Sequence, residues 1–188
     1  MNQQRLFSNF KNCIPVLFVS WIVSLSSVAS AECPAYLHGK YRVLHSIKEV
    51  DMCTLTENKP VLIINTASHC GFTSQFKALE AINQKYKEKG LVVIGFASDD
   101  FTQESKDEAE AAGICFLNYG VTFTMLAPTH VKGDEANAVF KGLAAQSKAP
   151  KWNFNKYVVD KKGVLIKHFG SLVKPDSEDV SKAIEKAL

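Results

Sequence analysis

Hydrophobic and polar positions along this chain follow two periods, one typical of buried strands and one typical of amphipathic helices. Residues 61–64 form a short, β-branched apolar run with the length of a buried strand. A polar turn over residues 65–72 follows, and apolar side chains then recur three or four residues apart, which predicts a helix. These side chains are Phe76, Leu79, Ile82 and Tyr86, with Gly90 placed to end the helix. A second apolar run over residues 91–96 completes a β-α-β unit, for which we expect parallel strands and a right-handed crossover.

The rest of the chain continues this alternation of strands and helices. The predicted elements are a helix over residues 104–116 weakened by Gly113, a strand over 121–125, a helix over 134–145, a hairpin of strands 155–160 and 164–169, and a last helix capped by Ser177 or Asp176. Residues 32–59 are expected to form an arm with at most a short strand or hairpin. This order predicts one α/β domain with a thioredoxin-like fold, in which a central mixed β-sheet carries helices on both faces.

The first 31 residues have the pattern of a secretory signal peptide. Arg5 and Lys11 supply a positive start, residues 14–25 form an apolar stretch, and residues 29–31 read Ala-Ser-Ala, the form of a cleavage site. An uncleaved membrane anchor is the alternative, but the apolar stretch is short for a full span. We therefore expect a signal peptide over residues 1–31 and a domain over residues 32–188. That domain would be exported, periplasmic or secreted, with no stable membrane insertion after cleavage.

Charge and motifs narrow the function classes. Without the two basic residues of the leader, the chain holds 20 basic and 19 acidic residues, a formal charge of +1. This balance predicts no nucleic-acid partner. The sequence contains no glycine-rich nucleotide loop, no histidine pair at metal-ligand spacing and no Cys-x-x-Cys motif. We expect no cofactor and no metal, and the missing Cys-x-x-Cys argues against a general disulfide oxidoreductase.

Four cysteines follow the leader, namely Cys33, Cys53, Cys70 and Cys115, and they allow three pairings. Cys33 and Cys53 bracket the N-terminal arm, so we expect them to form a structural disulfide. Cys70 and Cys115 lie inside the domain, where we interpret them as a separate functional pair. Export leaves open the alternative that all four cysteines are structural.

Cys70 is the candidate for chemistry because of its place between strand and helix. The expected N-terminus of the helix presents unpaired N–H groups and the positive end of a dipole, which favour a negative charge. A thiol there loses its proton more readily, and the thiolate is the reactive form. A buried, inert cysteine or half of a disulfide remains the alternative at this point.

Three sequence blocks resemble the glutathione peroxidase family. They are residues 65–75 (NTASHCGFTSQ), residues 118–123 (NYGVTF) and residues 152–157 (WNFNKY), and the resemblance extends from about residue 60 to residue 188. It implies a thioredoxin fold, reduction of hydroperoxides, and a cysteine-containing, exported member of bacterial type. Cys70 stands where the family has its peroxidatic residue, and Trp152 and Asn153 stand where it places an indole N–H and a carboxamide near the sulfur. Cys115 stands where thioredoxin-dependent members carry a resolving cysteine.

Four positions depart from the family pattern, namely Asp100, Ser74, Thr124 and His69, and Asp100 bears most directly on the chemistry. Asp100 occupies the place of a usual glutamine in the loop after the second strand. An ionised carboxylate beside a thiolate would raise the pKa of the thiol. Asp100 would therefore turn away, stay protonated, or accept the thiol proton itself. We include it among the candidate catalytic residues on this basis.

The leading hypothesis is an exported thiol peroxidase. The Cys70 thiolate would attack hydrogen peroxide or an organic hydroperoxide, Cys115 would resolve the sulfenic acid, and a thioredoxin-type dithiol protein would restore both thiols. In one alternative, glutathione is the direct reductant and Cys115 is idle. In another, the chain is a non-catalytic thioredoxin-like redox or binding module, a reading that the substitution at Asp100 keeps open.

Overall fold

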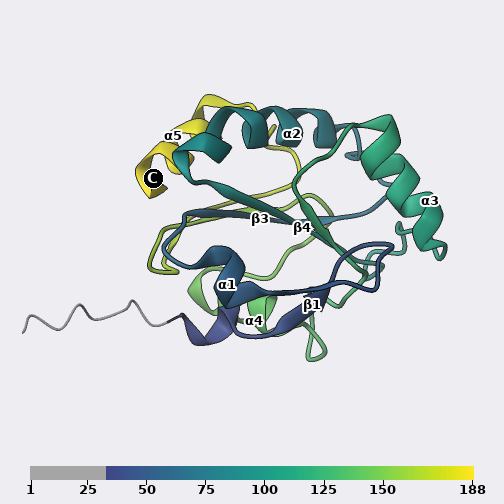
Figure 1. Cartoon of the computed structure of the whole chain (residues 1–188), viewed down its shortest axis with the longest axis horizontal. Coiled ribbons are helices and arrows are strands. Elements are labelled where there is room, and N and C mark those ends of the chain that lie inside the picture. Colours follow the sequence, from purple (N-terminus) through teal and green to yellow (C-terminus); the bar gives the residue numbers. More distant parts are fainter. Residues whose placement is uncertain (1–32) are drawn as a thin grey trace, which may run out of the picture. The chain divides into compact units, whose positions relative to one another are not determined.

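The computed structural model describes residues 33–188, which fold around a five-stranded mixed sheet with the order β5-β4-β3-β6-β7 (Figure 1). The strands are β3 (Val61–Thr66), β4 (Val92–Ala97), β5 (Thr124–Leu126), β6 (Lys156–Val159) and β7 (Leu165–Phe169). Strands β3, β4 and β5 are parallel, whereas β6 and β7 run antiparallel to their neighbours. The parallel β3–β4 pair agrees with the predicted β-α-β unit. The expected signal peptide lies outside the described residues.

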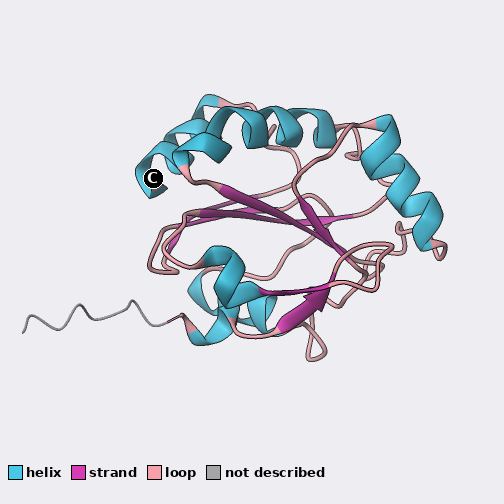
Figure 2. Ribbon diagram, viewed as in Figure 1, coloured by secondary structure: helices cyan, strands magenta, loops and turns pink. Residues whose placement is uncertain are grey.

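Helices cover both faces of this sheet (Figure 2). One face carries α2 (Gln75–Tyr86) and α5 (Glu178–Ala187), and the other carries α1 (Met52–Thr56) and α4 (Ala138–Gln146). Helix α3 (Glu108–Ala112) continues directly into a π-helical segment, η3 (Gly113–Asn118). The architecture is the α/β arrangement that the order of elements predicted.

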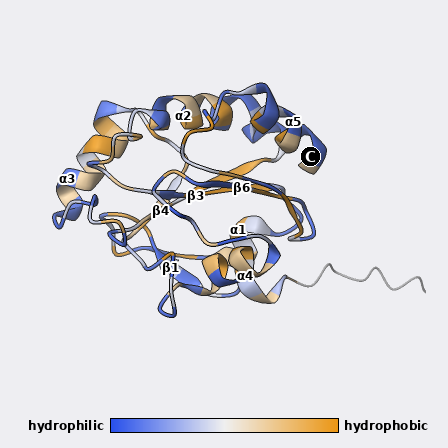
Figure 3. Ribbon diagram, turned by 180° about the vertical axis from the view of Figure 1, so that it is seen from behind, coloured by the Kyte–Doolittle hydropathy of each residue, from blue (hydrophilic) through white to orange (hydrophobic). Residues whose placement is uncertain are grey.

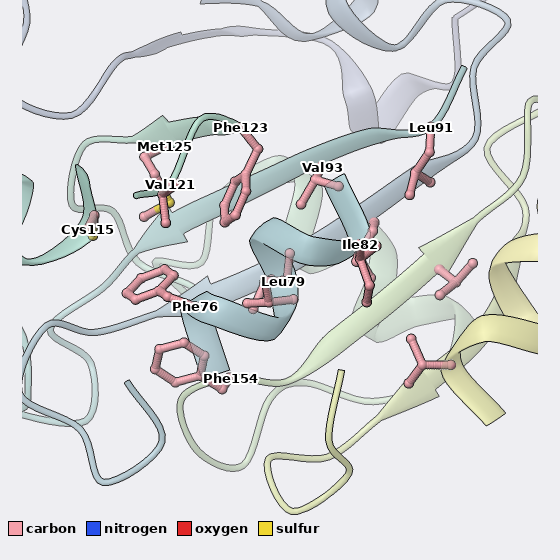
Figure 4. Close-up of a cluster of buried hydrophobic side chains, with 14 of the residues drawn as sticks. Phe76, Leu79, Ile82, Leu91, Val93, Cys115, Val121, Phe123, Met125 and Phe154 are labelled. Atoms are coloured by element: carbon pink, nitrogen blue, oxygen red, sulfur yellow. The ribbon is translucent and has the colours of Figure 1, made fainter. Parts of the chain in front are cut away.

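Strand alternation divides the core into two apolar clusters. Successive side chains of a strand point to opposite faces, so Leu62 and Ile64 pack beneath α2 and α5 while Val61 and Ile63 pack against the other helices. On the α2 side, Phe76 and its helical neighbours meet side chains of the sheet and of the segment after η3 (Figure 4). The strands are apolar and the outer helix surfaces are polar (Figure 3), as expected for a sheet buried on both faces.

Two helices, α3 and α4, begin later than the sequence predicted, each directly after a residue whose side chain caps the helix. Helix α3 begins four residues later than expected, because the Asp107 carboxylate accepts the backbone N–H of Ala109 and caps it there. Asn137 caps α4 in the same way, so that helix begins at Ala138. Ser177 caps α5, as predicted.

The N-terminal arm contains more structure than the sequence indicated. It forms η1 (Ala35–Leu37), a hairpin of β1 (Lys40–Arg42) and β2 (Glu49–Asp51), and the helix α1. A disulfide joins Cys33 to Cys53, as predicted. The arm packs on α4 at Gly142, where a Cβ atom would lie 2.2 Å from Cβ of Tyr36. Only glycine leaves room for this contact.

Within residues 33–188, none of the helices has both the length and the apolar character that crossing a bilayer requires. The apolar stretch of the expected leader precedes this part of the chain.

The disulfide should contribute measurably to stability. Cys33 and Cys53 are 20 residues apart, and closing a loop of that size stabilises by roughly 3 kcal/mol through the entropy of the unfolded chain. We expect the double variant Cys33→Ser/Cys53→Ser to lose about that much free energy of unfolding in urea, with Cys70 and Cys115 intact in both proteins. A loss below about 0.5 kcal/mol would show that the arm is held by packing alone.

Candidate active site

Cys70 lies in the turn that follows β3, at the edge of the sheet where the parallel strands end. It is a free thiol and its side chain is buried. Its Sγ accepts a hydrogen bond from the backbone N–H of Phe72 at 3.5 Å. Helix α2 begins at Gln75, so Cys70 lies before the helix rather than at its N-terminus, the second of the two placements that the sequence allowed. The donor at the sulfur therefore belongs to the turn itself.

Thr73 holds this turn in shape. Its Oγ1 accepts the backbone N–H of Cys70 at 3.0 Å and lies 2.9 Å from the carbonyl oxygen of Ala67, to which it can donate. The backbone N–H of Thr73 also donates to the carbonyl oxygen of Cys70 at 2.9 Å. The hydroxyl is buried, so water does not compete for these bonds. The sequence analysis did not single out this residue, although a buried hydroxyl three positions after a reactive cysteine is a usable signal.

The Trp152–Asn153 segment precedes β6 at the same edge of the sheet. Trp152 is 40% exposed, and its ring lies 5.4 Å from that of Phe101. Asn153 is fully buried, and neither its Nδ2 nor its Oδ1 has a hydrogen-bond partner within residues 33–188. Such groups are rare in folded proteins, because an unpaired buried amide costs about 1–3 kcal/mol. An unpaired amide at a candidate site is suited to bind a group that appears during the reaction.

Asn65, near the end of β3, fastens this segment to the sheet. Its Nδ2 donates to the carbonyl oxygen of Trp152 at 3.0 Å, and its Oδ1 accepts the backbone N–H of Asn155 at 3.0 Å. Its carbonyl oxygen accepts the N–H of Phe154 at 2.6 Å. Phe154 has φ of +58°, a left-handed conformation that is strained for a bulky residue. Asn65 therefore stabilises a backbone shape that the local sequence disfavours, and the sequence analysis gave it no such role.

Cys115 lies within η3 and is also a free, buried thiol. Its side chain contributes to the apolar cluster under α2 (Figure 4). Burial, together with the nearby charge of Glu104, raises the pKa of Cys115 to about 12. Cys70 belongs to the same cluster, but no disulfide joins the two cysteines in this structure. The predicted roles of Cys70 and Cys115 as a functional pair stay predictions.

Glu104 is a buried carboxylate that the sequence analysis did not consider. Burial raises its pKa, and hydrogen bonds from Ser68 and Ser105 offset part of that shift. It accepts the backbone N–H of Ser105 at 3.0 Å, and both the N–H and the hydroxyl of Ser68 donate to it. Because Ser68 lies two residues before Cys70, Glu104 ties the Cys70 turn to the segment leading into α3.

The Asp100 carboxylate is bound to the loop after β5. Its Oδ1 lies 2.6 Å from Nδ1 of His130, and its Oδ2 accepts the backbone N–H groups of Val131 at 2.7 Å and Lys132 at 3.1 Å. Burial raises the pKa of Asp100, but these hydrogen bonds outweigh burial, and the pKa lies below its ordinary value. The carboxylate is therefore ionised at neutral pH. Among the described residues, none of its hydrogen bonds involves Cys70, which favours the alternative in which Asp100 turns away from the sulfur.

An open, apolar hollow of about 310 Å³ adjoins these groups. It is lined by Phe72, Trp152, Gly170, Ser171, Leu172 and Val173. Phe72 also donates its backbone N–H to the Cys70 sulfur, so one residue both lines the hollow and contacts the thiol. This places an apolar approach for a small substrate beside the thiol.

One group of potential metal ligands clusters in the described part of the chain. Cys33, His38 and Cys53 place their ligand atoms within 4.8 Å of one another. The disulfide engages both sulfur atoms, however, and leaves one imidazole as the available donor. We assign no metal centre to these residues.

The position of Asp100 generates a prediction about Asp100→Gln. Because the carboxylate is bound to residues 130–132, we expect the variant to react with peroxide at the wild-type rate and with the same pH profile. We expect its free energy of unfolding at pH 6 to fall by about 1–3 kcal/mol, since charge-assisted hydrogen bonds are lost. A change in the rate of reaction with peroxide, or in its pH profile, would show that Asp100 acts on the Cys70 sulfur.

The stability difference between the wild type and Asp100→Gln should depend on pH, because the pKa values of both Asp100 and His130 are shifted. The pKa of Asp100 is lowered, so its contribution is present above the ordinary value of 3.8 and is lost as the pH falls through the folded value. The pKa of His130 is raised by Asp100, so its contribution is complete below 6.5 and is lost as the pH rises through the folded value. Urea unfolding of the wild type and Asp100→Gln should be measured from pH 3 to pH 9. We expect the difference in their free energies of unfolding to be largest between the ordinary pKa values of 3.8 for Asp100 and 6.5 for His130.

Comparisons with known proteins agree with this geometry. The family model described as glutathione peroxidase matches residues 40–144. The "Glutathione peroxidase-like peroxiredoxin GPX5" of Chlamydomonas reinhardtii is 44% identical over 138 residues, which cover 70% of this chain and 84% of that protein. The "Glutathione peroxidase homolog BsaA" of Staphylococcus aureus strain MW2 is 43% identical over 134 residues, covering 68% and 84%.

A solved structure supports the same assignment. Trgpx in its apo form is 29% identical to this chain, with a TM-score of 0.63 over 82% of this chain and 95% of that one. The thioredoxin-like fold predicted from the sequence is thereby confirmed. The chain belongs to the glutathione peroxidase family, and it is a peroxidase.

Proposed function

We propose that this protein is an exported thiol peroxidase in which Cys70 is the residue that attacks the peroxide. The observation that carries the proposal is the free, buried Cys70 thiol, whose Sγ already accepts a backbone N–H within a turn fixed by Thr73. In the first step the Cys70 thiolate bonds to the terminal oxygen of ROOH and the O–O bond breaks. The leaving alkoxide takes up a proton to give ROH, and Cys70 becomes a sulfenic acid.

Neutral donors suit this step. The backbone N–H of Phe72 stabilises a thiolate without forming a fixed ion pair. We assign the Asn153 amide and the Trp152 indole N–H the task of stabilising the sulfur anion and the departing oxygen. The unpaired Asn153 side chain supports this assignment, because the proposed anions would supply the partner that it lacks.

Cys115 is proposed as the resolving cysteine. Its thiol would condense with the Cys70 sulfenic acid to give a disulfide and water, and an external dithiol would then reduce that disulfide by exchange. Two features support local opening of this segment, which the buried Cys115 needs before it can react. It lies in a π-helix, a strained form found mostly at functional sites, and Gly113 begins the π-helical turn.

A thioredoxin-type dithiol protein is the proposed reductant. The algal relative is named a peroxiredoxin, which supports this choice over glutathione. Direct reduction by glutathione remains the second candidate, because the S. aureus relative is named a glutathione peroxidase homolog. Membership of a peroxidase family sets aside the reading of a non-catalytic binding module. Hydrogen peroxide and small organic hydroperoxides are both proposed as substrates, and no prosthetic cofactor is required.

Export is part of the proposal. Residues 1–31 are proposed as a signal peptide and residues 32–188 as the mature peroxidase domain, acting in the periplasm or outside the cell. The Cys33–Cys53 disulfide supports this location, since such bonds persist in oxidising compartments.

Replacing Asn153 separates its catalytic from its structural contribution. Asn153→Leu should react with peroxide about 100-fold more slowly, because a donor to the developing anions is lost. Its free energy of unfolding should stay equal or rise by about 1 kcal/mol, because an unpaired buried amide is removed. Asn155→Leu is the matched contrast: that amide is paired with Trp152 and His168, so this variant should be destabilised. A strongly destabilised Asn153→Leu would contradict the assignment.

The role of Cys115 is tested by separating the first turnover from recycling. Cys115→Ser should consume one equivalent of peroxide and accumulate a Cys70 sulfenic acid that dimedone labels, whereas Cys70→Ser should do neither. With thioredoxin and its reductase supplying electrons, Cys115→Ser should not turn over. If it recycles as fast as the wild type with glutathione alone, glutathione is the reductant and Cys115 is a core residue.

A further inference from the structure

Lys156, the first residue of β6, is a fully buried lysine. Within residues 33–188, no carboxylate lies within ion-pair distance of its Nζ. Nζ donates to Oε1 of Gln75 at 2.9 Å and lies 3.5 Å from the carbonyl oxygen of Ser171. Lysine is among the residues that are almost never fully buried without an ionic partner, because desolvation of the ammonium is costly. An apolar side chain would serve the core at lower cost.

The partners of Lys156 connect it to the helix that follows Cys70. Gln75 is the first residue of α2, and its Nε2 donates to the carbonyl oxygen of Ser171 at 2.7 Å. Lys156 and Gln75 therefore bind the start of α2 to the turn after β7. The same helix start is anchored to the Cys70 turn, because the N–H of Gln75 donates to the carbonyl oxygen of Phe72 at 2.8 Å.

Ser171 carries the network on to the Trp152–Asn153 segment. Its hydroxyl donates to the carbonyl oxygen of Asn153 at 2.6 Å and accepts from Nδ2 of Asn155 at 3.2 Å. The same Nδ2 donates to the carbonyl oxygen of Trp152 at 2.8 Å. The hydrogen bonds that begin at Lys156 thus extend to the backbone carbonyl groups of Trp152 and Asn153, the two proposed donors.

We propose that Lys156 is a positioning residue of the peroxidase reaction, which sets the Trp152–Asn153 segment relative to the turn that carries Cys70. The inference rests on the proposed function for its catalytic consequence, but its structural content is independent of it. Lys156 Nζ supplies the donor for Gln75 Oε1 and lies within reach of the Ser171 carbonyl, which Gln75 Nε2 also binds, so the three groups form one closed set of hydrogen bonds. Rate depends steeply on the placement of reacting groups, so a small displacement of the segment is enough to slow the reaction.

The charge state of Lys156 does not decide this role. Burial lowers its pKa to about 7, and both the ammonium and the neutral amine offer N–H donors to the two acceptors. The titratable group that feels its charge is His168 on the adjacent strand. Burial, Lys148 and Lys156 lower the pKa of His168 to about 4, so this imidazole is neutral at pH 7.

The test replaces Lys156 with methionine, which has similar length and no donor. The chain contains two tryptophans, Trp152 and Trp21 in the proposed signal peptide, so a Trp21→Phe background leaves Trp152 as the sole tryptophan in precursor and mature protein alike. We expect Lys156→Met to react with hydrogen peroxide at least about tenfold more slowly than the background protein. Its urea midpoint should be equal or higher, and acrylamide should quench Trp152 more efficiently. Lys162→Met, an exposed lysine in the β6–β7 turn, is the matched control and should match the background in all three measurements.

A second variant keeps the inference testable if Lys156→Met does not fold. Gln75→Leu removes the acceptor of the same bond, and we expect the same direction of change in rate and quenching. The double variant should be no slower than Gln75→Leu alone, because that substitution already breaks the Lys156–Gln75 bond together with the bond from Gln75 to the Ser171 carbonyl.

Three outcomes would overturn the inference. A rate within twofold of the background with unchanged quenching would show that Lys156 positions nothing. A slower rate accompanied by a lowered urea midpoint would show a general structural role. Additive effects of Lys156→Met and Gln75→Leu would show separate roles. If the background protein itself does not react with peroxide, the proposed function fails, and the quenching and midpoint measurements still decide the role of Lys156.

Discussion

The hydrogen bonds of Asn65 hold the two halves of the site together. One half is the turn after β3, which carries Cys70, and the other is the segment before β6, which carries Trp152 and Asn153. Asn65 contributes to both, because its backbone is part of β3 and its side chain and carbonyl bind three consecutive peptide groups of the segment. Without these bonds, the left-handed backbone at Phe154 would have no compensation. Asn65 therefore joins the donor segment directly to β3, and Ser171 and Asn155 also bind the same segment.

Most of the buried polar groups gather at this edge of the sheet. Asn65, Asn153, Asn155 and Lys156 are all buried there, and each carries a desolvation cost. Three of them are paired with one another or with nearby backbone, which makes the edge rigid and specific. Asn153 is the exception, because its side chain has no partner. A rigid network around one unpaired amide is the arrangement expected where a protein binds a transient anion.

The two cysteines lie in segments of different character. The Cys70 turn is fixed by Thr73 and Glu104-bound Ser68, whereas Cys115 lies in a π-helix, a rare form that is frequent at functional sites. In the proposed cycle the peroxide-reactive thiol stays in place and the resolving thiol moves. Burial keeps Cys115 protonated until then, since its pKa is raised to about 12. The rate at which Cys115 reacts would then depend on the free energy of local unfolding of η3.

Periodicity, capping and three sequence blocks were sufficient to predict the mixed sheet, the helices on its faces, the family and the Cys33–Cys53 disulfide. These features depend on local patterns of apolar side chains and on residues close in sequence, which is why they can be read along the chain. The extra helix α1 and the π-helix at Cys115 depend on tertiary packing and were not predicted. The surroundings of Asp100 came only from the structure, because His130 and Lys132 are about 30 positions away. The roles of Asn65 and Lys156 also required it, since hydrogen bonds over more than 80 residues leave no periodic trace in a sequence.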